Sequence, residues 1–271
     1  MKIAAIVVTY HPDTQLFLNN LDVYQEAVDK ILIWRNSKEE VKLPKHLLSK
    51  IEFCGNGTNE YMAKPLNYAI GWCLKNQYDY LLTMDQDSTW KNCNDFISYV
   101  KKNHQGHVAI YAPNVNEQHQ IHETEINVES VITSGSLCNV KIAHKLGGFR
   151  EDYQIYWVDC EYCYWVCKNG YEIKILPHCH LLQRFGKETK TIFGYTAANY
   201  APIIYYFMFR NILKMKKEYR NHPSWRCILY TTFYYIRGIL LGENHKLKKL
   251  FMIGKGYWNG IFQPIKNKRN L

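Results

Sequence analysis

The chain has 271 residues, 47% of them hydrophobic and 21% charged, a composition that supports a packed core and excludes an intrinsically disordered protein. Its formal net charge of +10 is unevenly distributed: residues 184–271 carry 17 Lys and Arg against three acids, whereas residues 1–183 have a net charge of −4. The nine cysteines lack the spacing of a disulfide scaffold, which indicates reduced thiols in a cytoplasmic protein. No run of about 20 apolar residues occurs, so we expect no membrane-spanning helix.

The first half of the chain alternates predicted strands and helices. Residues 2–9 predict a buried strand rather than a signal peptide, because polar residues and a proline follow where a cleavage site would lie. Further strands are predicted over 31–34, 50–55, 78–84 and 107–113, and helices over 13–30, 64–75 and 94–103. This alternation is typical of a mostly parallel α/β sheet, in which ligands bind at the carboxyl ends of the strands.

Beyond Pro113 the pattern changes. Residues 114–129 are polar and predict a long loop or a hairpin. The elements predicted after it are a strand with a glycine turn over 130–140, a short helix over 141–149, a helix ended by Gly170 and a strand to Pro177. From about Tyr200 the chain is predicted to be helical.

Two aspartates, Asp85 and Asp87, follow directly after the apolar run 80–84. Alternate residues of an extended chain project to the same side, so two negative charges meet and both pKa values rise unless a cation lies between them. Carboxylate oxygens are ligands that divalent cations prefer. The alternative interpretation is that these residues and Ser88 only cap a turn or a helix.

Several segments together resemble bacterial glycosyltransferase family 2, the nucleotide-diphospho-sugar transferases of GT-A fold, and in particular its rhamnosyltransferase-like branch. The resemblance extends from residue 3 to about residue 211 and is carried by IVVTYHPD, NEYMAKPLNYAI, YDYLLTMDQDS, ITSGSLCNVKIAHKLGGF, YWVDCEYCYW and YYFMFRN. It implies an α/β fold with a mixed central sheet flanked by helices and a helical C-terminal extension. We expect a catalytic domain over 1–199, with a nucleotide-binding half over about 1–112 and an acceptor half over about 113–199. The extension would cover 200–271.

The resemblance implies an inverting, metal-dependent hexosyltransferase. Its donor would be a nucleotide-diphospho-sugar, dTDP-rhamnose or a UDP-hexose, and its acceptor a polysaccharide or a lipid-linked glycan of the cell envelope. Mn²⁺ or Mg²⁺ would neutralise the departing diphosphate. The protein would then act in the cytoplasm, peripherally at the inner face of the bacterial membrane.

The resemblance also assigns roles to individual residues. Asp85 and Asp87 are the implied metal ligands, with His180 as a substitute for a family histidine that aligns with Gln183. The implied nucleotide-sugar pocket comprises Thr9, Tyr10, Asp13, Asn36, Asn67, Asp85 and Gln86. The loop around Gly135 is expected to line the sugar pocket.

Asp159 is the implied catalytic base, expected to be an exposed aspartate with a pKa near 4, and Glu161 would position the acceptor. Both acids would also favour the N-terminus of the following helix. The chain departs from the family at Arg35, where an aspartate usually contacts the base. Because arginine cannot accept a hydrogen bond, either Asn36 or a backbone carbonyl would take this role.

The basic, aromatic C-terminal region leaves several interpretations open. Basic side chains interleaved with aromatic ones suit an anionic membrane surface, but they also suit nucleic acid or a solvated helical face. We favour the membrane and expect no nucleic acid. The rival functions are a non-catalytic anion or nucleic-acid binder and a nucleotidyltransferase. Arg210 and Asn211 would either bind phosphate or pack the region's first helix.

Overall fold

The computed structural model describes residues 1–39, 41–120, 122–191, 194, 196–265 and 269. Its contacts divide the chain into two compact units. Unit 1 comprises Met1–Phe149 and Asp159–Arg184, and unit 2 comprises Arg150–Val158 and Phe185–Leu271. The segment 150–158 therefore packs with the C-terminal helices, although both of its sequence neighbours belong to unit 1. The functional division at residue 199 stays a prediction.

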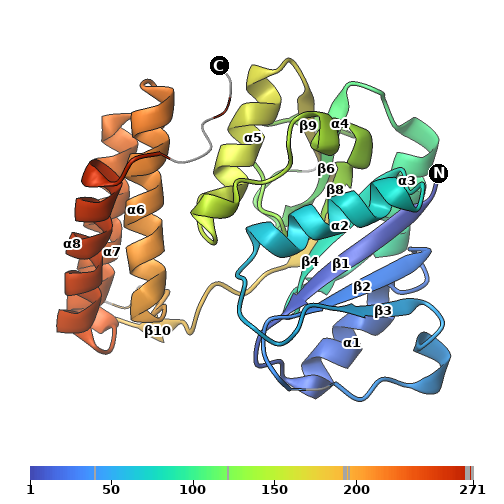
Figure 1. Cartoon of the computed structure of the whole chain (residues 1–271), viewed down its shortest axis with the longest axis horizontal. Helices are drawn as coiled ribbons and strands as arrows, with labels where there is room; N and C mark the ends of the chain where they lie inside the picture. The colour runs from blue at the N-terminus through green and yellow to red at the C-terminus, as the bar shows by residue number, and fades with distance from the viewer. Residues whose placement is uncertain (40, 121, 192–193, 195, 266–268, 270–271) are drawn as a thin grey trace. The chain divides into compact units, whose positions relative to one another are not determined.

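Unit 1 is built on a mixed sheet with the strand order β3-β2-β1-β4-β8-β6-β9-β5 and with β7 beside β9 (Figure 1). The strands are β1 (Ile3–Thr9), β2 (Lys30–Arg35), β3 (Ile51–Cys54), β4 (Tyr80–Asp85), β5 (Thr89–Trp90), β6 (Val108–Val115), β7 (Ile126–Asn127), β8 (Ser136–Asn139) and β9 (Glu172–Leu182). Neighbours among β1 to β4 pair in parallel, β8 is antiparallel to both β4 and β6, and β6 and β9 are parallel. The carboxyl ends of β1, β2, β4, β6 and β9 consequently lie along one edge, called the carboxyl edge below.

Helices cover both faces of this sheet. They are α1 (Thr14–Tyr24), α2 (Ala63–Lys75), α3 (Cys93–Asn103), α4 (Val140–Lys145) and α5 (Val158–Lys168). Every residue of β1 is buried. Its odd-numbered side chains, such as Ala5 and Val7, join Phe17 and Leu21 of α1 in one apolar cluster. The alternation of side chains along a strand turns the even-numbered ones toward the opposite face, where α2 lies across β1 and β4 (Figure 1). The predicted α/β architecture is confirmed.

The structure departs from the sequence predictions in local details. The helix predicted to reach residue 30 ends at Tyr24, because Asp29 binds Ile3 instead of continuing the helix. The Asp29 amide donates to the Ile3 carbonyl (2.8 Å), and the Ile3 amide donates to the Asp29 carboxylate (2.8 Å). Of the two alternatives for residues 114–129, the described residues support a long loop over a hairpin, since the short strand β7 pairs with β9. Short β5 was not predicted.

The strand predicted to end at Pro177 continues to Leu182 as β9. A shift in its register with β6 lies between Pro113 and Asn114, and the Asn114 side chain donates to the Pro177 carbonyl (3.0 Å). A proline, which has no N–H to give to the ladder, is tolerated at such a bulge. The longer strand carries residues 178–183 to the carboxyl edge.

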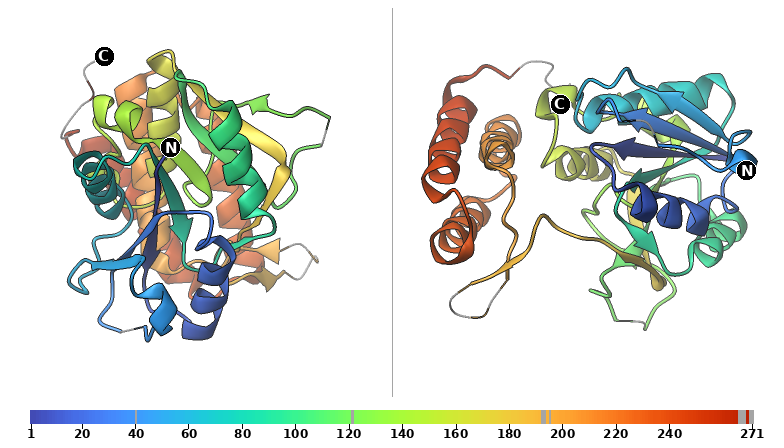
Figure 2. Two further views of the ribbon diagram at one scale, coloured as in Figure 1. Left: turned by 90° about the vertical axis from the view of Figure 1, so that its right-hand side faces the viewer. Right: turned by 90° about the horizontal axis from the view of Figure 1, so that it is seen from below.

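Unit 2 contains three α-helices and a short hairpin in its described residues, and the helical region that the sequence predicts from about Tyr200 is confirmed. These elements are α6 (Pro202–Tyr219), α7 (Trp225–Gly242), α8 (Lys246–Phe262), β10 (Thr189–Lys190) and β11 (Thr196–Ala197). Helices α6 and α8 pack along their lengths (Figure 2). A Cβ at Gly256 would lie 2.6 Å from the carbonyl oxygen of Tyr206, and one at Gly260 would lie 2.9 Å from that of Arg210. Only glycine permits this approach without displacement of backbone.

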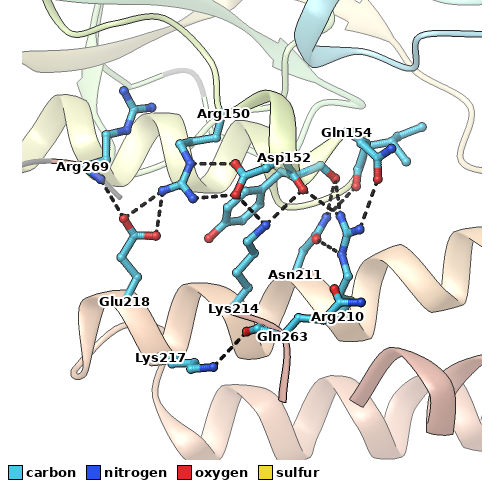
Figure 3. A network of polar contacts seen from close by, with 12 residues as sticks. Arg150, Asp152, Gln154, Arg210, Asn211, Lys214, Lys217, Glu218, Gln263 and Arg269 are labelled. Atoms are coloured by element: carbon cyan, nitrogen blue, oxygen red, sulfur yellow. Dashed lines mark hydrogen bonds and ion pairs between the residues drawn. The ribbon is translucent and has the colours of Figure 1, made fainter. Parts of the chain in front are cut away.

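Buried ion pairs tie the segment 150–158 to α6 (Figure 3). The Arg150 guanidinium donates to Asp152 (2.8 Å) and to Glu218 (2.7 Å), and the Lys214 ammonium lies 2.6 Å from the Asp152 carboxylate. Exposed fractions of these side chains are 15% or less. Removal of one member would therefore leave a buried charge poorly compensated.

Arg210 and Asn211 hold the backbone of the same segment (Figure 3). The Asn211 amide nitrogen lies 2.8–2.9 Å from the carbonyl oxygens of Tyr153, Ile155 and Tyr156. The Arg210 guanidinium donates to the carbonyls of residues 152 and 153 and to the Gln154 side chain. These contacts favour the packing interpretation of Arg210 and Asn211 over a phosphate site.

The close approach of α8 to α6 predicts opposite effects for two glycines of α8. Gly256→Ala should lower the free energy of unfolding by about 1–3 kcal/mol, because the new methyl group overlaps a backbone carbonyl. Gly254→Ala is the matched control. Nothing lies within 4 Å of its Cβ position, so it should raise stability by about 0.5–1 kcal/mol through helix propensity. Urea unfolding measures both, and equal effects would contradict the packing.

Asp152 predicts a pH dependence of stability. Burial by itself raises its pKa, but hydrogen bonds and charges from Arg150 and Lys214 outweigh burial, so the pKa is lowered. A lowered carboxyl pKa contributes stability above the unfolded value near 4, and that contribution is lost as the pH falls through the folded value. Asp152→Asn should cost about 1.5–3 kcal/mol at pH 7.

The stability difference between wild type and Asp152→Asn should then narrow below about pH 4. Denaturant unfolding between neutral and acidic pH measures it. A difference that stays constant across this range would show that the carboxylate charge does not stabilise the segment 150–158.

Candidate active site

The carboxyl edge brings together residues from distant parts of unit 1. In the parallel register, Thr9 at the end of β1 lies opposite Arg35 at the end of β2, and Val8 lies opposite Asp85 at the end of β4. Because β8 runs antiparallel to β4, with Ser136 opposite Thr83, the loop that precedes β8 reaches the same edge. Topology thus joins segments that are up to about 130 residues apart in sequence.

The Asp85 and Asp87 carboxyl groups repel one another at this edge. Burial and then the charge of Asp87 raise the pKa of Asp85 to about 7, with a smaller contribution from Asp159. A hydrogen bond from the Gln183 amide nitrogen to Asp85 Oδ2 (3.1 Å) acts in the opposite direction. Burial also raises the pKa of Asp87, against the nearby charge of Arg184. The edge therefore concentrates negative charge that this chain neutralises only in part.

Gln183, rather than His180, lies beside the aspartate pair. The His180 amide donates to Asn92 (2.8 Å), and its side chain acts electrostatically on Glu117. Among the described residues no three His, Cys, Asp or Glu side chains converge as a metal site, so His180 does not join Asp85 and Asp87. Its role as a metal ligand stays a prediction that this arrangement does not support.

The glycine loop before β8 is held against the aspartates by hydroxyl groups. Ser88 Oγ contacts both the Gln183 side-chain oxygen and Ser134 Oγ, and Ser134 Oγ accepts from the Asp85 amide (3.2 Å). Gly135 has φ +80°, and a Cβ there would lie 2.8 Å from the Pro113 side chain. The loop therefore requires glycine at this position.

Arg184 and Ser88 were not predicted as site residues, and Gln183 was considered only as the position that aligns with a family histidine. A signal for Arg184 existed, since it follows a strand whose carboxyl end lies beside those of β4 and β6. It was obscured because the strand was expected to end at Pro177. Ser88 was predicted only as a cap, yet it is completely buried and bridges two loops.

Asp159 lies in the first turn of α5 and acts electrostatically on Asp85. Its Oδ1 accepts from the Cys160 amide (2.8 Å). It is half-buried rather than exposed, and burial raises its pKa above the expected value near 4. Glu161 is completely buried, so its carboxyl group does not contact solvent.

The residues after β1 are organised by Gln86. The Tyr10 amide donates to Gln86 Oε1 (2.8 Å) and Gln86 Nε2 donates to the Tyr10 carbonyl (3.0 Å). Tyr10 is 49% exposed. Thr9 is buried and donates to the Trp34 carbonyl, while Asp13 is the N-cap of α1.

Asn36 and Asn67 use their amide groups inside the protein. Asn36 Oδ1 accepts from the Trp34 indole and from the Glu60 amide, both at 3.0 Å, which occupies its two lone pairs. Asn67 exchanges two hydrogen bonds with the backbone of Phe149 (2.7 and 2.8 Å). A Cβ at Gly148, which has φ +64°, would lie 2.4 Å from the Asn67 side-chain oxygen. Both asparagines thus hold backbone groups of unit 1, and their roles in the nucleotide-sugar pocket stay predictions.

The chemistry of the aspartate pair fits a divalent cation. Two partly buried carboxylates with raised pKa values supply hard oxygen ligands and a local charge that a cation would stabilise. Two carboxylates are fewer than a protein uses to enclose a metal by itself. They are the usual number where a substrate phosphate supplies further ligands.

No protein-family model matches the sequence. The chain is 24% identical over 276 residues to dTDP-rhamnosyl transferase RfbF of Shigella flexneri, and the match covers 93% of this chain and 92% of that protein. The similarity therefore extends along nearly the full length of both.

Two solved structures share the fold. The mannosyltransferase PcManGT from Pyrobaculum calidifontis, in complex with GDP-Man and Mn²⁺, has a TM-score of 0.58 and 13% identity over 97% of this chain and 76% of its own. GalNAc-T7 with UDP, GalNAc and Mn²⁺ has a TM-score of 0.53 and 8% identity over 67% of this chain. The chain spans 43% of the GalNAc-T7 structure. The predicted GT-A-like fold is confirmed.

The contacts of Asn67 predict a structural role that unfolding can test. Asn67→Ala should lower the free energy of unfolding by about 1–3 kcal/mol, because the Phe149 amide and carbonyl both lose a partner. Asn103→Ala is the control, since that side chain is exposed and binds only its own helix at Tyr99; its effect should stay within about 0.5 kcal/mol. Equal stability of the two variants would contradict this role.

Proposed function

We propose that this chain, a glycosyltransferase similar along its length to a dTDP-rhamnosyl transferase, moves a hexose from a nucleotide-diphospho-sugar to a glycan with inversion at the anomeric carbon. The observation that carries the proposal is the incompletely neutralised aspartate pair at the carboxyl edge, with Asp159 within electrostatic reach. The curated relative favours dTDP-rhamnose as donor, and a UDP-hexose is the alternative.

In this proposal Asp85 and Asp87 hold Mn²⁺ or Mg²⁺ together with the donor diphosphate. The cation would supply positive charge where negative charge develops on the leaving nucleoside diphosphate. Gln183 orients the Asp85 carboxylate by its hydrogen bond. Arg184, whose charge acts on Asp87, is available to the same diphosphate.

In this proposal, groups other than the Asn36 side chain recognise the nucleotide base, because both acceptor sites of the Asn36 side-chain oxygen are already occupied. Backbone carbonyls near the ends of β1 and β2 are the acceptors we propose for a pyrimidine N3–H. The exposed Tyr10 ring, held by Gln86, offers an aromatic face for stacking.

Asp159 is proposed as the base that takes the proton from the attacking acceptor hydroxyl. Its raised pKa makes it a better proton acceptor than an ordinary aspartate, because efficiency improves as the pKa of a base approaches the working pH. Its position at the start of α5, in electrostatic contact with Asp85, supports a placement near the reacting carbon. Glu161 is proposed to support this turn of α5 from inside rather than to contact the acceptor.

The acceptor we propose is a polysaccharide or lipid-linked glycan, and the protein would then work peripherally at the inner face of the bacterial membrane. In the described part of the chain no helix is long and apolar enough to cross a bilayer.

The division of roles predicts different defects for two aspartates. Asp87→Ala should abolish the Mn²⁺-dependent thermal shift caused by the donor, because a ligand of the cation is lost. Asp159→Asn should keep that shift and lower the rate of transfer about 10²- to 10⁴-fold, the usual contribution of a general base. Asp22→Asn, an exposed aspartate of α1, is the control and should change neither.

Screening starts from dTDP-rhamnose and continues with UDP-hexoses, and product analysis identifies the reaction. Sugar transfer releases a nucleoside diphosphate, whereas nucleotidyl transfer releases inorganic diphosphate. Equal loss of donor binding in both variants would refute the separate roles. Release of inorganic diphosphate would refute sugar transfer.

A further inference from the structure

Helices α7 and α8 expose an unusual amount of apolar surface. More than half of the large hydrophobic side chains that the described structure exposes lie on these two helices. They are Trp225, Leu229, Tyr230, Phe233, Tyr234, Leu240, Leu247, Phe251, Trp258, Ile261 and Phe262, with exposed fractions of 39–85%. Concentrated apolar exposure of this kind marks an interaction surface, whereas isolated exposed residues do not.

The exposed side chains form a stripe on each helix. On α7 they recur at intervals of three or four residues, as in Trp225, Leu229 and Phe233, and on α8 they include Leu247 and Phe251. Such spacing places residues on one face of a helix. The opposite face of α8 carries Gly256 and Gly260, which pack against α6. Each helix therefore buries one side inside unit 2 and presents its other, apolar side to solvent. We call these two stripes the α7–α8 face.

The charge on this face has one sign. Five basic residues on the two helices are exposed, namely Arg226, Arg237, Lys246, Lys248 and Lys255. Glu243 is the one acid between residues 225 and 262. It is buried, where it accepts from Lys249 (2.8 Å) and from the Tyr205 hydroxyl (2.6 Å). The α7–α8 face consequently presents cations without any exposed carboxylate.

We propose that the α7–α8 face docks on the surface of an anionic lipid bilayer. Aromatic and aliphatic side chains would enter the boundary between head groups and acyl chains, where Trp and Tyr are favoured. Arginine and lysine can bury their stems beside them and keep their charges at the phosphate level. Each basic residue near an anionic membrane surface adds attraction. Helices that bury their other side in the protein lie along such a surface rather than cross it.

The charge pattern favours lipid over a second copy of the chain. A two-fold interface brings the same patch of both copies together. On this face that would bring two sets of five exposed cations together, and neither α7 nor α8 supplies an exposed acid. An anionic bilayer supplies the missing negative charge. Charge complementarity therefore favours an anionic bilayer as the binding partner of the α7–α8 face.

This inference deepens the proposed function, because it names the surface through which the transferase would reach a membrane-borne acceptor. It does not depend on the chemistry at the carboxyl edge, and binding to lipid can be measured without donor or acceptor.

Vesicle flotation of the full chain tests the proposal. The protein should float with vesicles of phosphatidylcholine mixed with phosphatidylglycerol. With vesicles of phosphatidylcholine alone, it should remain in the bottom fraction. Raising the salt concentration should weaken binding, because charges near the surface are screened. Arg226→Gln with Arg237→Gln should weaken binding roughly 30-fold, as expected for the loss of two surface cations.

A second double variant tests the apolar part of the face. Phe251→Ser with Trp258→Ser should abolish flotation and leave the unfolding transition near that of wild type, because both side chains are more than 60% exposed. Leu48→Ser with Leu74→Ser removes exposed apolar side chains from unit 1 and is the matched control; it should float like wild type.

Three outcomes would overturn the proposal. The first is equal binding of wild type to neutral and anionic vesicles, and the second is loss of binding in the unit 1 control alone. The third is that wild type does not bind vesicles but forms concentration-dependent dimers in light scattering, while the α8 variant stays monomeric. The donor thermal shift, measured without vesicles, should be the same in all variants. If that shift is absent from wild type while flotation persists, the proposed transferase function fails and the docking surface stands.

Discussion

The candidate site depends on the repulsion between carboxylates that the sheet topology brings to one edge. Asp85 and Asp87 are two residues apart in sequence, whereas Asp159 is distant in sequence but belongs to the same unit and acts electrostatically on Asp85. Burial keeps these charges from full hydration, so their pKa values rise. An arrangement that lowers stability by itself persists where function requires it. Here a cation shared with a diphosphate would neutralise the carboxylates and so remove the repulsion between them.

The residues around the pair show how the protein maintains that arrangement. Ser88, Ser134 and Gln183 form a chain of hydrogen bonds that reaches Asp85. Asn36 donates to the Tyr61 carbonyl and Asn67 to the Phe149 carbonyl, and these bonds hold further loops of unit 1 in place. Polar side chains near a ligand site often serve in this way, since a precise site needs fixed surroundings. Their residue types alone do not distinguish a wall from a ligand contact.

The sequence predicted the elements whose patterns are local. The apolar runs of β1 and β4 and the helix with Pro65 in its first turn were predicted nearly to the residue, because burial and turn chemistry act over short distances. The full length of β9 was missed, because a bulge opposite Asn114 accommodates Pro177. That error concealed Arg184. The exposed state expected for Asp159 was wrong for a similar reason, since burial depends on how α5 packs.

The sequence by itself determined the α/β class, the acidic pair after an apolar strand, and a C-terminal region rich in basic and aromatic residues. Each depends on composition or on spacing of a few residues, which propensity and periodicity reveal directly. The tertiary structure decided which side chains meet Asp85, that Arg210 and Asn211 hold the segment 150–158, and that the aromatic residues of α7 and α8 face solvent. These features depend on contacts between residues far apart in the chain, and no local pattern records which partners will meet.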